Sequence, residues 1–412
     1  MKAIPDALGR WLTSPLLLRP VFASLRFFAP VLIFGNKVVL SRHADVIEVL
    51  ERKEDFTVSE INAQNINRHD GPFILGMDVS EQYEREEGLL REAVRRTDLD
   101  LISSITVENA ATLIREAQSL GRIDVVNGFA RVVAARLVIS YFGVPAPEAG
   151  EGQLMNWLRD IFFDVFLNFT NDRQKREAAI RSGKQLRQHL DDEIARRNAL
   201  PATPAQADDV LGRLLALKGP LRPWLDDDTV RRNLSGLIVG AVETTSKFVA
   251  LAMNELLRRP ETMKSARRAA LDGDTETVRR YAYESGRFNP HTPFMLRYCR
   301  HESLLRAGSR HERRIPAGSF VLLGTISAMF DPSGFPSPRQ FRIDREPQSE
   351  YLHFGFGMHR CFGYYINSRQ IPELVAALLR LPDLRRAPGR AGRISFAGPF
   401  PDRFVLEFDG NK

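Results

Sequence analysis

Cys361 is the residue whose type and surroundings point most directly to chemistry. It is one of two cysteines in the chain and lies in a glycine-rich stretch, YLHFGFGMHRCFGYYIN, at residues 351–367. A cysteine that binds a metal acts as a thiolate, whose negative charge needs stabilising. The helix expected after Gly363 would place free N–H groups and the positive end of its dipole beside the sulfur. Gly355 and Gly357 would allow a tight loop, and a flat cofactor could lie against their backbone.

The residues alone leave several roles open for this cysteine. Zinc is disfavoured, because only one cysteine is present locally and zinc takes three or four protein ligands. A catalytic nucleophile would need a histidine base, and His359 is close in sequence but poorly oriented for that role. A buried structural thiol is the ordinary fate of a free cysteine, and we assign that role to Cys299.

The segment FGFGMHRCFG, Phe354 to Gly363, resembles the haem-ligand loop of the cytochrome P450 family. It matches the pattern F-G-x-G-x-H-x-C-x-G at every fixed position. The resemblance implies that Cys361 is the axial ligand of the iron of haem b, the haem-thiolate arrangement. It also implies that Phe354 shields the sulfur and that His359 hydrogen-bonds a haem propionate. The fixed glycines of the pattern are Gly355, Gly357 and Gly363.

Two upstream segments match the same family in the expected order. Glu284 and Arg287 lie at i and i+3 in YESGR, on one face of an expected helix. They resemble the core ion pair of the family, whose role is structural. Arg297 follows ten residues after Arg287. It resembles a second propionate-binding arginine.

The segment GAVETT, residues 240–245, resembles the oxygen-activating segment of the family. Thr244 can bond to the carbonyl of Gly240 four residues earlier, which bends or opens a helix. Gly240 and Ala241 are small and leave space against a haem. The resemblance implies that Glu243 and Thr244 form the acid–alcohol pair that delivers protons to bound dioxygen. If the segment is instead an ordinary helix, its small residues would only allow a neighbour to pack closely, and the Thr244 hydroxyl would only satisfy its own hydrogen bond.

Residues 76–96 depart from the family pattern. The family has D-P-P-x-H-x-x-x-R there, whereas this chain has neither the prolines nor the histidine. The propionate contacts expected from this region are therefore in doubt, and the candidates are Tyr83, Arg85 and Arg91. Ile366-Asn367-Ser368 replaces the common L-A-R after the cysteine loop, which indicates a divergent branch.

The elements that must position these residues are mostly helical. Residues 31–41 predict a hairpin about Gly35-Asn36, and residues 313–323 predict a strand pair about Gly318. The longest helix is expected from Asp226 to Arg259, and another from Gly363 to Leu381 with a kink at Pro372. Residues 197–209 predict a mobile loop. The predicted fold class is mainly α with a small β-rich region (α+β), near 31–41 and 292–325. The resemblance implies a single cytochrome P450 domain over 1–412, with an N-terminal extension at about 1–30.

Composition favours a soluble, cytoplasmic protein. Apolar residues make up 43% and charged residues 26%, and the net charge is +7, which is ordinary globular composition. The basic residues form no stripe interleaved with aromatics, so nucleic acid is not an expected partner. Arginines and prolines interrupt the apolar N-terminal segment, and we expect no transmembrane segment.

The resemblance implies a haem-thiolate monooxygenase that inserts one oxygen atom of O₂ into a small apolar substrate. No flavin or iron–sulfur module is evident, so electrons would come from a ferredoxin-type or flavodoxin-type donor with its reductase. We expect an acidic donor to dock on a basic face around Arg339, Arg342 and Arg360. The alternatives are an H₂O₂-dependent peroxygenase and a non-enzymatic haem sensor or carrier, and Glu243 with Thr244 argues against both. Phenylalanine-rich residues 160–170, residues 292–295 and residues 395–400 are candidate pocket linings.

Overall fold

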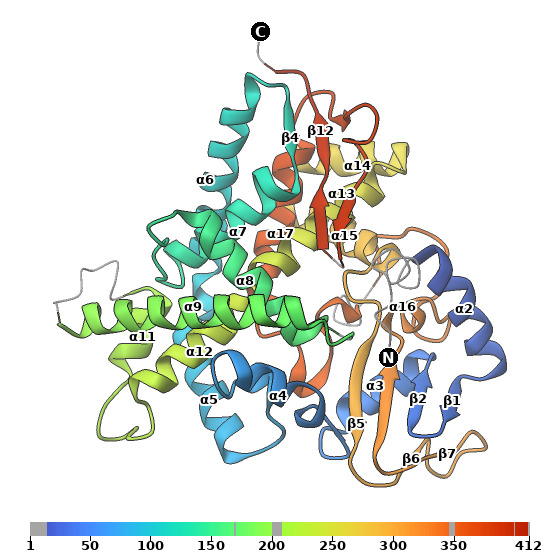
Figure 1. The fold of residues 1–412 in the computed structure, drawn as a ribbon. Helices are drawn as coiled ribbons and strands as arrows, with labels where there is room; N and C mark the ends of the chain where they lie inside the picture. Colours follow the sequence, from blue (N-terminus) through green and yellow to red (C-terminus); the bar gives the residue numbers. More distant parts are fainter. Residues whose placement is uncertain (1–14, 169, 200–207, 346–350, 399, 411–412) are drawn as a thin grey trace.

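The computed structural model has a roughly triangular outline, with the C-terminus at one corner (Figure 1). The strands of the larger sheet and helix α2 occupy another corner, and helices make up most of the rest, apart from a smaller sheet toward the C-terminal corner. The structure describes residues 15–168, 170–199, 208–345, 351–398 and 400–410. The first half of the expected N-terminal extension and most of the expected loop at 197–209 lie outside these ranges. The long helix α9 extends into the start of that loop, to Ala199.

Helices dominate the described chain, as predicted. Their bounds are α2 Pro15–Phe28, α3 His43–Glu51, α4 Ser59–His69, α5 Glu81–Ala93, α6 Leu99–Gln118, α7 Arg131–Ser140, α8 Glu151–Phe166, α9 Arg173–Ala199, α11 Val210–Ala216, α12 Asp227–Val239, α13 Val242–Leu256, α14 Pro260–Leu271, α15 Thr275–Phe288, α16 Thr325–Ala328 and α17 Tyr364–Leu379. A π-helical turn, Val126–Ala130, leads directly into α7. Pro372 lies inside α17, and the helix continues through it to Leu379.

The strands are short and form four small sheets. Their bounds are β1 Val31–Phe34, β2 Lys37–Leu40, β3 Phe56–Thr57, β4 Arg122–Asp124, β5 Met295–Cys299, β6 Ser303–Leu305, β7 Arg313–Ile315, β8 Ser319–Leu323, β9 Arg385–Arg386, β10 Ser395–Ala397, β11 Phe400–Arg403 and β12 Val405–Glu407. The largest sheet has the order β1-β2-β8-β5-β3. It contains the predicted hairpin, whose turn residue Gly35 has a φ of 58°.

One strand pairing differs from the prediction. The strands on either side of Gly318 exist, but they do not pair with each other. β7 pairs with β6, whereas β8 lies between β2 and β5 in the larger sheet. The reason is non-local: β8 completes hydrogen bonds with strands nearly 300 and about 20 residues away, and a local hairpin would leave those strands without a neighbour.

The helix expected from Asp226 to Arg259 is divided into α12 and α13. Asp226 caps the first helix by accepting a hydrogen bond from the Thr229 N–H at 2.8 Å. The break falls at Gly240 and Ala241, where the Ala241 N–H bonds to the Ile238 carbonyl three residues earlier. Pro260 begins the next helix, α14, rather than only ending this one.

The span Asp227–Leu256 is also long and apolar enough to cross a membrane by length and composition. This finding differs from the expectation that no segment would qualify. However, 67% of its most apolar window is buried inside the protein. Its apolar side chains are explained by core packing, because α13 lies against α7, α15 and α17.

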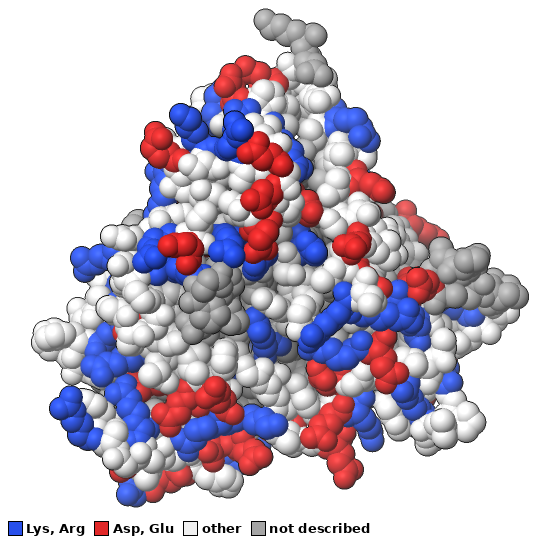
Figure 2. Space-filling model, turned by 180° about the vertical axis from the view of Figure 1, so that it is seen from behind, with Lys and Arg blue, Asp and Glu red and all other residues white. Residues whose placement is uncertain are grey.

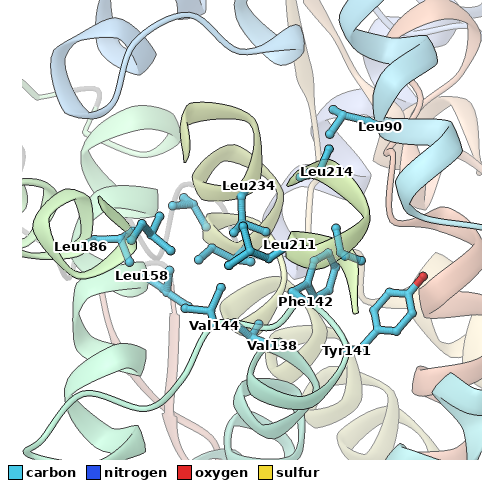
Figure 3. Packing of buried hydrophobic residues seen from close by; sticks show 14 of the residues in the cluster. Leu90, Val138, Tyr141, Phe142, Val144, Leu158, Leu186, Leu211, Leu214 and Leu234 are labelled. Atoms are coloured by element: carbon cyan, nitrogen blue, oxygen red, sulfur yellow. The ribbon is translucent and has the colours of Figure 1, made fainter. Parts of the chain in front are cut away.

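The core between α5, α7, α8, α9, α11 and α12 is built from leucine, valine and aromatic side chains (Figure 3). Leu158, Leu186, Leu211 and Leu234 converge there from four different helices. Tyr141 lies at the edge of this cluster, and its hydroxyl donates to Asp98 at 2.8 Å. This packing fixes α12 and the start of α13 in place, which is the segment that faces the candidate site.

Candidate active site

A cavity of about 1320 Å³ lies at the centre of the candidate site. Ordinary ligand pockets have volumes of about 300–1,000 Å³, so this cavity has room for a flat cofactor and a second molecule. Most residues predicted for cofactor or oxygen chemistry line it: Gly240, Ala241, Thr244, Arg297, Phe354, Gly355, His359, Cys361 and Gly363. They come from α13 and the break before it, from β5 and from the cysteine loop.

The cysteine loop approaches the cavity as a tight turn ahead of α17. The Cys361 N–H donates to the Phe354 carbonyl at 2.7 Å, which closes the loop on itself. Gly355 and Gly357 have φ values of 74° and 68°, in the left-handed region that favours glycine. Gly355 lines the cavity, but Gly357 does not. A side chain at Gly357 would come within 2.5 Å of the Leu50 carbonyl oxygen, so this glycine is needed to pack the loop against α3.

The Cys361 sulfur is held where an electrophilic metal would stabilise it. Burial raises the pKa of the thiol, while the Gly363 backbone N–H and the charges of Arg360 and Arg91 lower it. A buried thiol with a raised pKa is a poor free nucleophile but a suitable thiolate once a metal ion binds it. Cys299 differs: it is fully buried in β5, outside the cavity, and its thiol donates to the His301 carbonyl at 2.9 Å.

Aromatic rings pack around the start of the loop, and two of them, Phe354 and Phe248, also line the cavity. The Phe354 ring lies 5.3 Å from Tyr364, 5.7 Å from Tyr283 and 6.2 Å from Phe248, measured between ring centres. Phe354 is 8% exposed. The ring therefore belongs to a packed aromatic group next to the cysteine, as its expected shielding role requires.

The break between α12 and α13 opens the helix toward the cavity. The Thr244 hydroxyl donates to the Gly240 carbonyl at 2.5 Å, the contact expected from the sequence. Gly240 has nothing near its Cα except the Leu237 carbonyl oxygen, 3.9 Å from an added Cβ. The space beside Gly240 and Ala241 is therefore free for a ligand.

Glu243 does not line the cavity with Thr244. Its side chain is 2% exposed and its Oε1 lies 2.7 Å from Nη2 of Arg131 on α7. Burial raises the pKa of Glu243 above its ordinary value, and the charges of Arg131 and Arg159 oppose that rise. The acid and the alcohol are thus neighbours on one helix that face different surroundings. Sequence reasoning missed Arg131 because it lies more than 100 residues away.

Arg297 and His359 fit a cofactor that carries carboxylates. Arg297 is 8% exposed, and its hydrogen bond among the described residues goes to the Leu296 carbonyl, not to a carboxylate. Burial lowers its pKa to about 10. His359 lies near enough that Arg297, after burial, contributes to lowering its pKa to about 4. A buried cation without a carboxylate partner is costly, and the propionates of haem would supply that partner.

The three candidates from residues 76–96 do not reach the cavity. Tyr83 donates to the Met358 carbonyl at 3.0 Å, and its ring lies edge-on to His359 at 5.9 Å. Arg85 stacks over Trp224 at 4.9 Å. Arg91 pairs with Glu87 at 2.7 Å. Tyr83 and Arg91 therefore lie against the cysteine loop from outside the cavity, the latter over the Phe362 ring, whereas Arg85 has its partner elsewhere.

What α5 contributes instead is a buried carboxylate. Glu86 is fully buried. Its carboxylate accepts hydrogen bonds from both terminal nitrogens of Arg232 and from the side-chain amide of Asn233, both on α12. The Gln82 amide donates to the same carboxylate at 2.9 Å. This network fixes α5 to α12, and no motif in the sequence indicated it.

Arginines lie over all three aromatic rings that directly follow the cysteine, those of Phe362, Tyr364 and Tyr365. Arg91 lies 4.1 Å from the centre of Phe362, Arg360 lies 3.7 Å from Tyr364, and Arg96 lies 4.1 Å from Tyr365. Cations placed this way are attracted by the negative face of the ring. The result is a cluster of positive charge around the cysteine loop, which we call the arginine–aromatic cluster (Arg91, Arg96, Arg360 and their three rings).

Glu284 and Arg287 form a buried bidentate pair, with contacts of 2.7 and 2.9 Å and both side chains 0% exposed. Arg287 also donates to three backbone carbonyls between residues 329 and 340. Glu284 accepts from the Arg342 N–H and from the Tyr351 hydroxyl. The pair therefore ties α15 to the segments that lead into the cysteine loop and does not itself reach the cavity.

The stretches predicted as pocket linings all reach the cavity. Phe162, Phe163 and Phe166 face it from α8, Thr292 to Met295 from the segment before β5, and Phe396 from β10. Many other lining residues were missed, among them two that lie beside Thr244. Lys247 and Thr245 lie on α13, one turn or less from Thr244. The i, i+3 spacing from Thr244 to Lys247 was the available signal.

Comparison with known proteins agrees with this geometry. The family model described as "Cytochrome P450" matches residues 33–399. The steroid C26-monooxygenase of Mycolicibacterium smegmatis is 26% identical over 77% of this chain and 74% of its own length. The solved structure of CalO2 superposes with a TM-score of 0.82 at 22% identity, covering 99% of both chains. Psi-producing oxygenase A of Emericella nidulans is 34% identical over 113 residues, and the match spans 10% of its length.

The fold and the cysteine loop define a haem-thiolate protein, with haem b as the cofactor. The chain belongs to the cytochrome P450 family.

Proposed function

We propose that this protein is a monooxygenase that inserts one oxygen atom of O₂ into a small apolar organic substrate, with electrons supplied by separate proteins. The observation that supports this most directly is the shared cavity: Cys361 and Thr244 line it from two different elements, beside the open space at Gly240. The monooxygenase named among the relatives supports the same reaction class. The protein would act as a single domain over residues 1–412 in the cytoplasm.

The residues present would hold haem through three kinds of contact. Cys361 would supply the iron ligand, Arg297 and His359 would pair with the propionates, and Gly355 and Gly363 would leave room for the flat ring. When bound, the haem activates dioxygen, and electron donation by the thiolate favours cleavage of the O–O bond. The packed rings around Phe354 exclude water from the sulfur.

Thr244 and Glu243 would divide the handling of protons. The Thr244 hydroxyl lies at the opened turn and can hold a water molecule in the cavity. Glu243 lies behind it in a buried ion pair with Arg131. For Glu243 to take a proton inward, its carboxylate must exchange Arg131 for a water or for Thr244. The ion pair therefore regulates when the proton reaches the cavity.

The electron donor would dock at the arginine–aromatic cluster. Arg96 is exposed and Arg360 half-buried, and both lie next to the cysteine loop. Of the face expected from the sequence, Arg339 is exposed, but the Arg342 side chain pairs with Asp344 at 2.8 Å. Charges of both signs are interspersed over the side of the molecule shown in Figure 2. A local cluster, rather than the net charge of +7, would steer an acidic ferredoxin-type or flavodoxin-type donor.

The decisive experiment combines a spectrum with an oxidant test. The reduced protein with carbon monoxide should show the red-shifted band of a thiolate-ligated haem. Cys361→Ser should abolish that band, and Cys299→Ser, the matched control, should keep it. Turnover should require a reductase system and O₂. Brisk turnover with hydrogen peroxide alone would identify a peroxygenase, and an intact band with no turnover under any oxidant would identify a sensor or carrier.

A further inference from the structure

Lys247 is a cation in the cavity wall that no other described residue neutralises. It lies on α13, three residues after Thr244, and lines the same cavity. Among the described residues it has neither a hydrogen-bond partner nor an ion-pair partner. Its pKa is lowered to about 8 by burial. A lysine with that pKa is still mostly protonated at pH 7, and an unpaired buried charge is unfavourable.

The carboxylates that might serve Lys247 already have partners. Glu243 lies one turn earlier, at the i, i+4 spacing that usually pairs with a lysine, but Arg131 holds it. The carboxylates that line the cavity are Asp164 and Glu255. Asp164 accepts from Arg68, and Glu255 pairs with Arg259. The missing counter-charge therefore has to enter with a ligand.

His291 provides a second polar group beside Lys247. It lines the cavity from the segment before β5, and its Nδ1 is buried without a hydrogen-bond partner. Burial, followed by the nearby charge of Lys247, lowers its pKa to about 3. His291 is therefore neutral at pH 7 and can supply one N–H. One cation and one neutral donor match the two oxygens of a carboxylate.

The haem propionates do not explain Lys247. The charges that act on His359 are those of Arg297 and Asp78, whereas the charge that acts on His291 is that of Lys247. These are two separate groups of residues in one cavity. The wall also carries seven Lys and Arg side chains against two carboxylates. This imbalance favours an anionic ligand beyond the cofactor.

We propose that Lys247 and His291 form a carboxylate-binding subsite, and that the natural substrate is an amphipathic monocarboxylic acid. Its carboxylate would occupy the subsite, and its apolar body would lie against Phe162, Phe163 and Phe166 on α8. This inference rests on the proposed function, because it names the substrate class of the same cavity.

The test compares acids with their neutral esters in the haem-loaded protein. The probes are dodecanoate, hexadecanoate and a steroid carboxylic acid, each paired with its methyl ester. Binding is measured by calorimetry and by the shift of the haem absorbance band. A hydrogen bond to a charged group typically contributes about 1.5–3 kcal/mol, so wild type should bind at least one acid about 10- to 100-fold more tightly than its ester.

Three variants separate a carboxylate site from other roles. Lys247→Met keeps the length of the side chain and should remove the acid preference, while Lys247→Arg should retain most of it. Lys264→Met, at an exposed position on α14, should leave the preference unchanged. Wild type that binds every ester as well as its acid would overturn the proposal. So would a Lys247→Met variant that loses haem but keeps the acid preference, because Lys247 would then serve a propionate.

The pH profile gives an independent readout. Lys247 loses its charge as the pH rises, so the acid preference should be full at pH 7 and decline above about pH 8. Ester affinity should stay flat. His291 and His353, whose pKa values are about 3 and about 4, stay neutral throughout this range, and the Glu243 carboxylate is paired with Arg131 rather than with Lys247. An acid preference that is constant from pH 7 to pH 11 would contradict a lysine anchor. A missing carbonyl band would instead refute the proposed function, so the two failures are distinguishable.

Discussion

The guanidinium of Arg131 lies 2.7 Å from the carboxylate of Glu243, and both side chains are buried. This ion pair turns the acid away from the cavity that its neighbour Thr244 lines. Proton transfer through Glu243 therefore requires that its salt bridge with Arg131 be exchanged first. A glutamate whose carboxylate already pointed into the cavity would not require that step.

Glu243→Gln should slow reductant consumption and product formation together, because proton delivery then limits both. General acid–base catalysis is typically worth about 10²- to 10⁴-fold, so we expect a loss of at least about 100-fold in both rates. Burial raises the pKa of Glu243 above its ordinary value, and a proton donor acts in its protonated form. The wild-type rate should therefore fall as the pH rises through the pKa of Glu243, and this limb should vanish in the variant. Glu261→Gln, an exposed change on α14, is the control. Rates within about twofold of wild type for Glu243→Gln would contradict this role.

Thr244→Val should separate the two steps that Glu243→Gln slows together. Valine keeps the shape but removes the hydroxyl that would hold a water molecule, so electrons should be consumed while hydrogen peroxide is released. The measurement is product and peroxide per reductant oxidised. Thr245→Val is the matched neighbour, because that hydroxyl already donates to Asn367 at 3.0 Å, and it should keep the coupling. With peroxide supplied directly, the loss in Thr244→Val should be smaller; an equal loss would argue against proton delivery.

Arg96→Glu and Arg360→Glu should slow reduction by an acidic ferredoxin at low salt. Electrostatic steering falls steeply with ionic strength, so the difference from wild type should shrink as salt is raised. Stopped-flow reduction across a salt series measures it. Arg310→Glu, an exposed residue far along the chain from the cysteine loop, should behave as wild type. Reduction that is indifferent to salt in all four proteins would place the docking surface elsewhere.

Glu284→Gln should destabilise the fold by about 3–5 kcal/mol, because it leaves buried Arg287 without its counter-charge. Burial would raise the pKa of Glu284, but the pair with Arg287, the Arg342 N–H and the Tyr351 hydroxyl lower it overall. A lowered folded-state pKa stabilises the fold above the unfolded pKa, and this contribution disappears as the pH falls through the folded value. In urea unfolding over a pH series that extends well below 4.5, wild type should converge on the variant only as the pH falls below about 4.5. Glu276→Gln, in a partly exposed pair on the same helix, should cost about 1 kcal/mol or less.

What the sequence predicted well was local. The cysteine loop is one contiguous segment whose glycines and cysteine fix its own geometry, and the Thr244 to Gly240 bond joins residues four apart. The same bond indicated that the helix opens at this turn, although one continuous helix from Asp226 to Arg259 was expected. These features needed no knowledge of distant partners.

What the sequence did not predict depends on contacts between distant segments. The partner of Glu243 comes from α7, and the strand expected to pair with β7 pairs instead with β2 and β5. Tyr83 faces the back of the cysteine loop because α5 is rotated to bury Glu86 against Arg232. These pairings depend on which buried charge or strand edge would otherwise lack a partner. The spacing of residues within one segment does not contain that information.

The spacing of Thr244 and Lys247 along α13 sets a distance within the cavity. Thr244 and Lys247 are three residues apart, which is about 4.5 Å along a helix axis, and helical side chains lean toward the N-terminal end. On this spacing the ammonium group would lie back toward the turn of Thr244, and an acid bound at the proposed subsite would present its first carbons to the site of proton delivery. The position of Lys247 on the helix would therefore set how far the carboxyl end of the substrate lies from the site of proton delivery. Oxygen would then enter within a few carbons of the carboxyl group whatever the length of the tail.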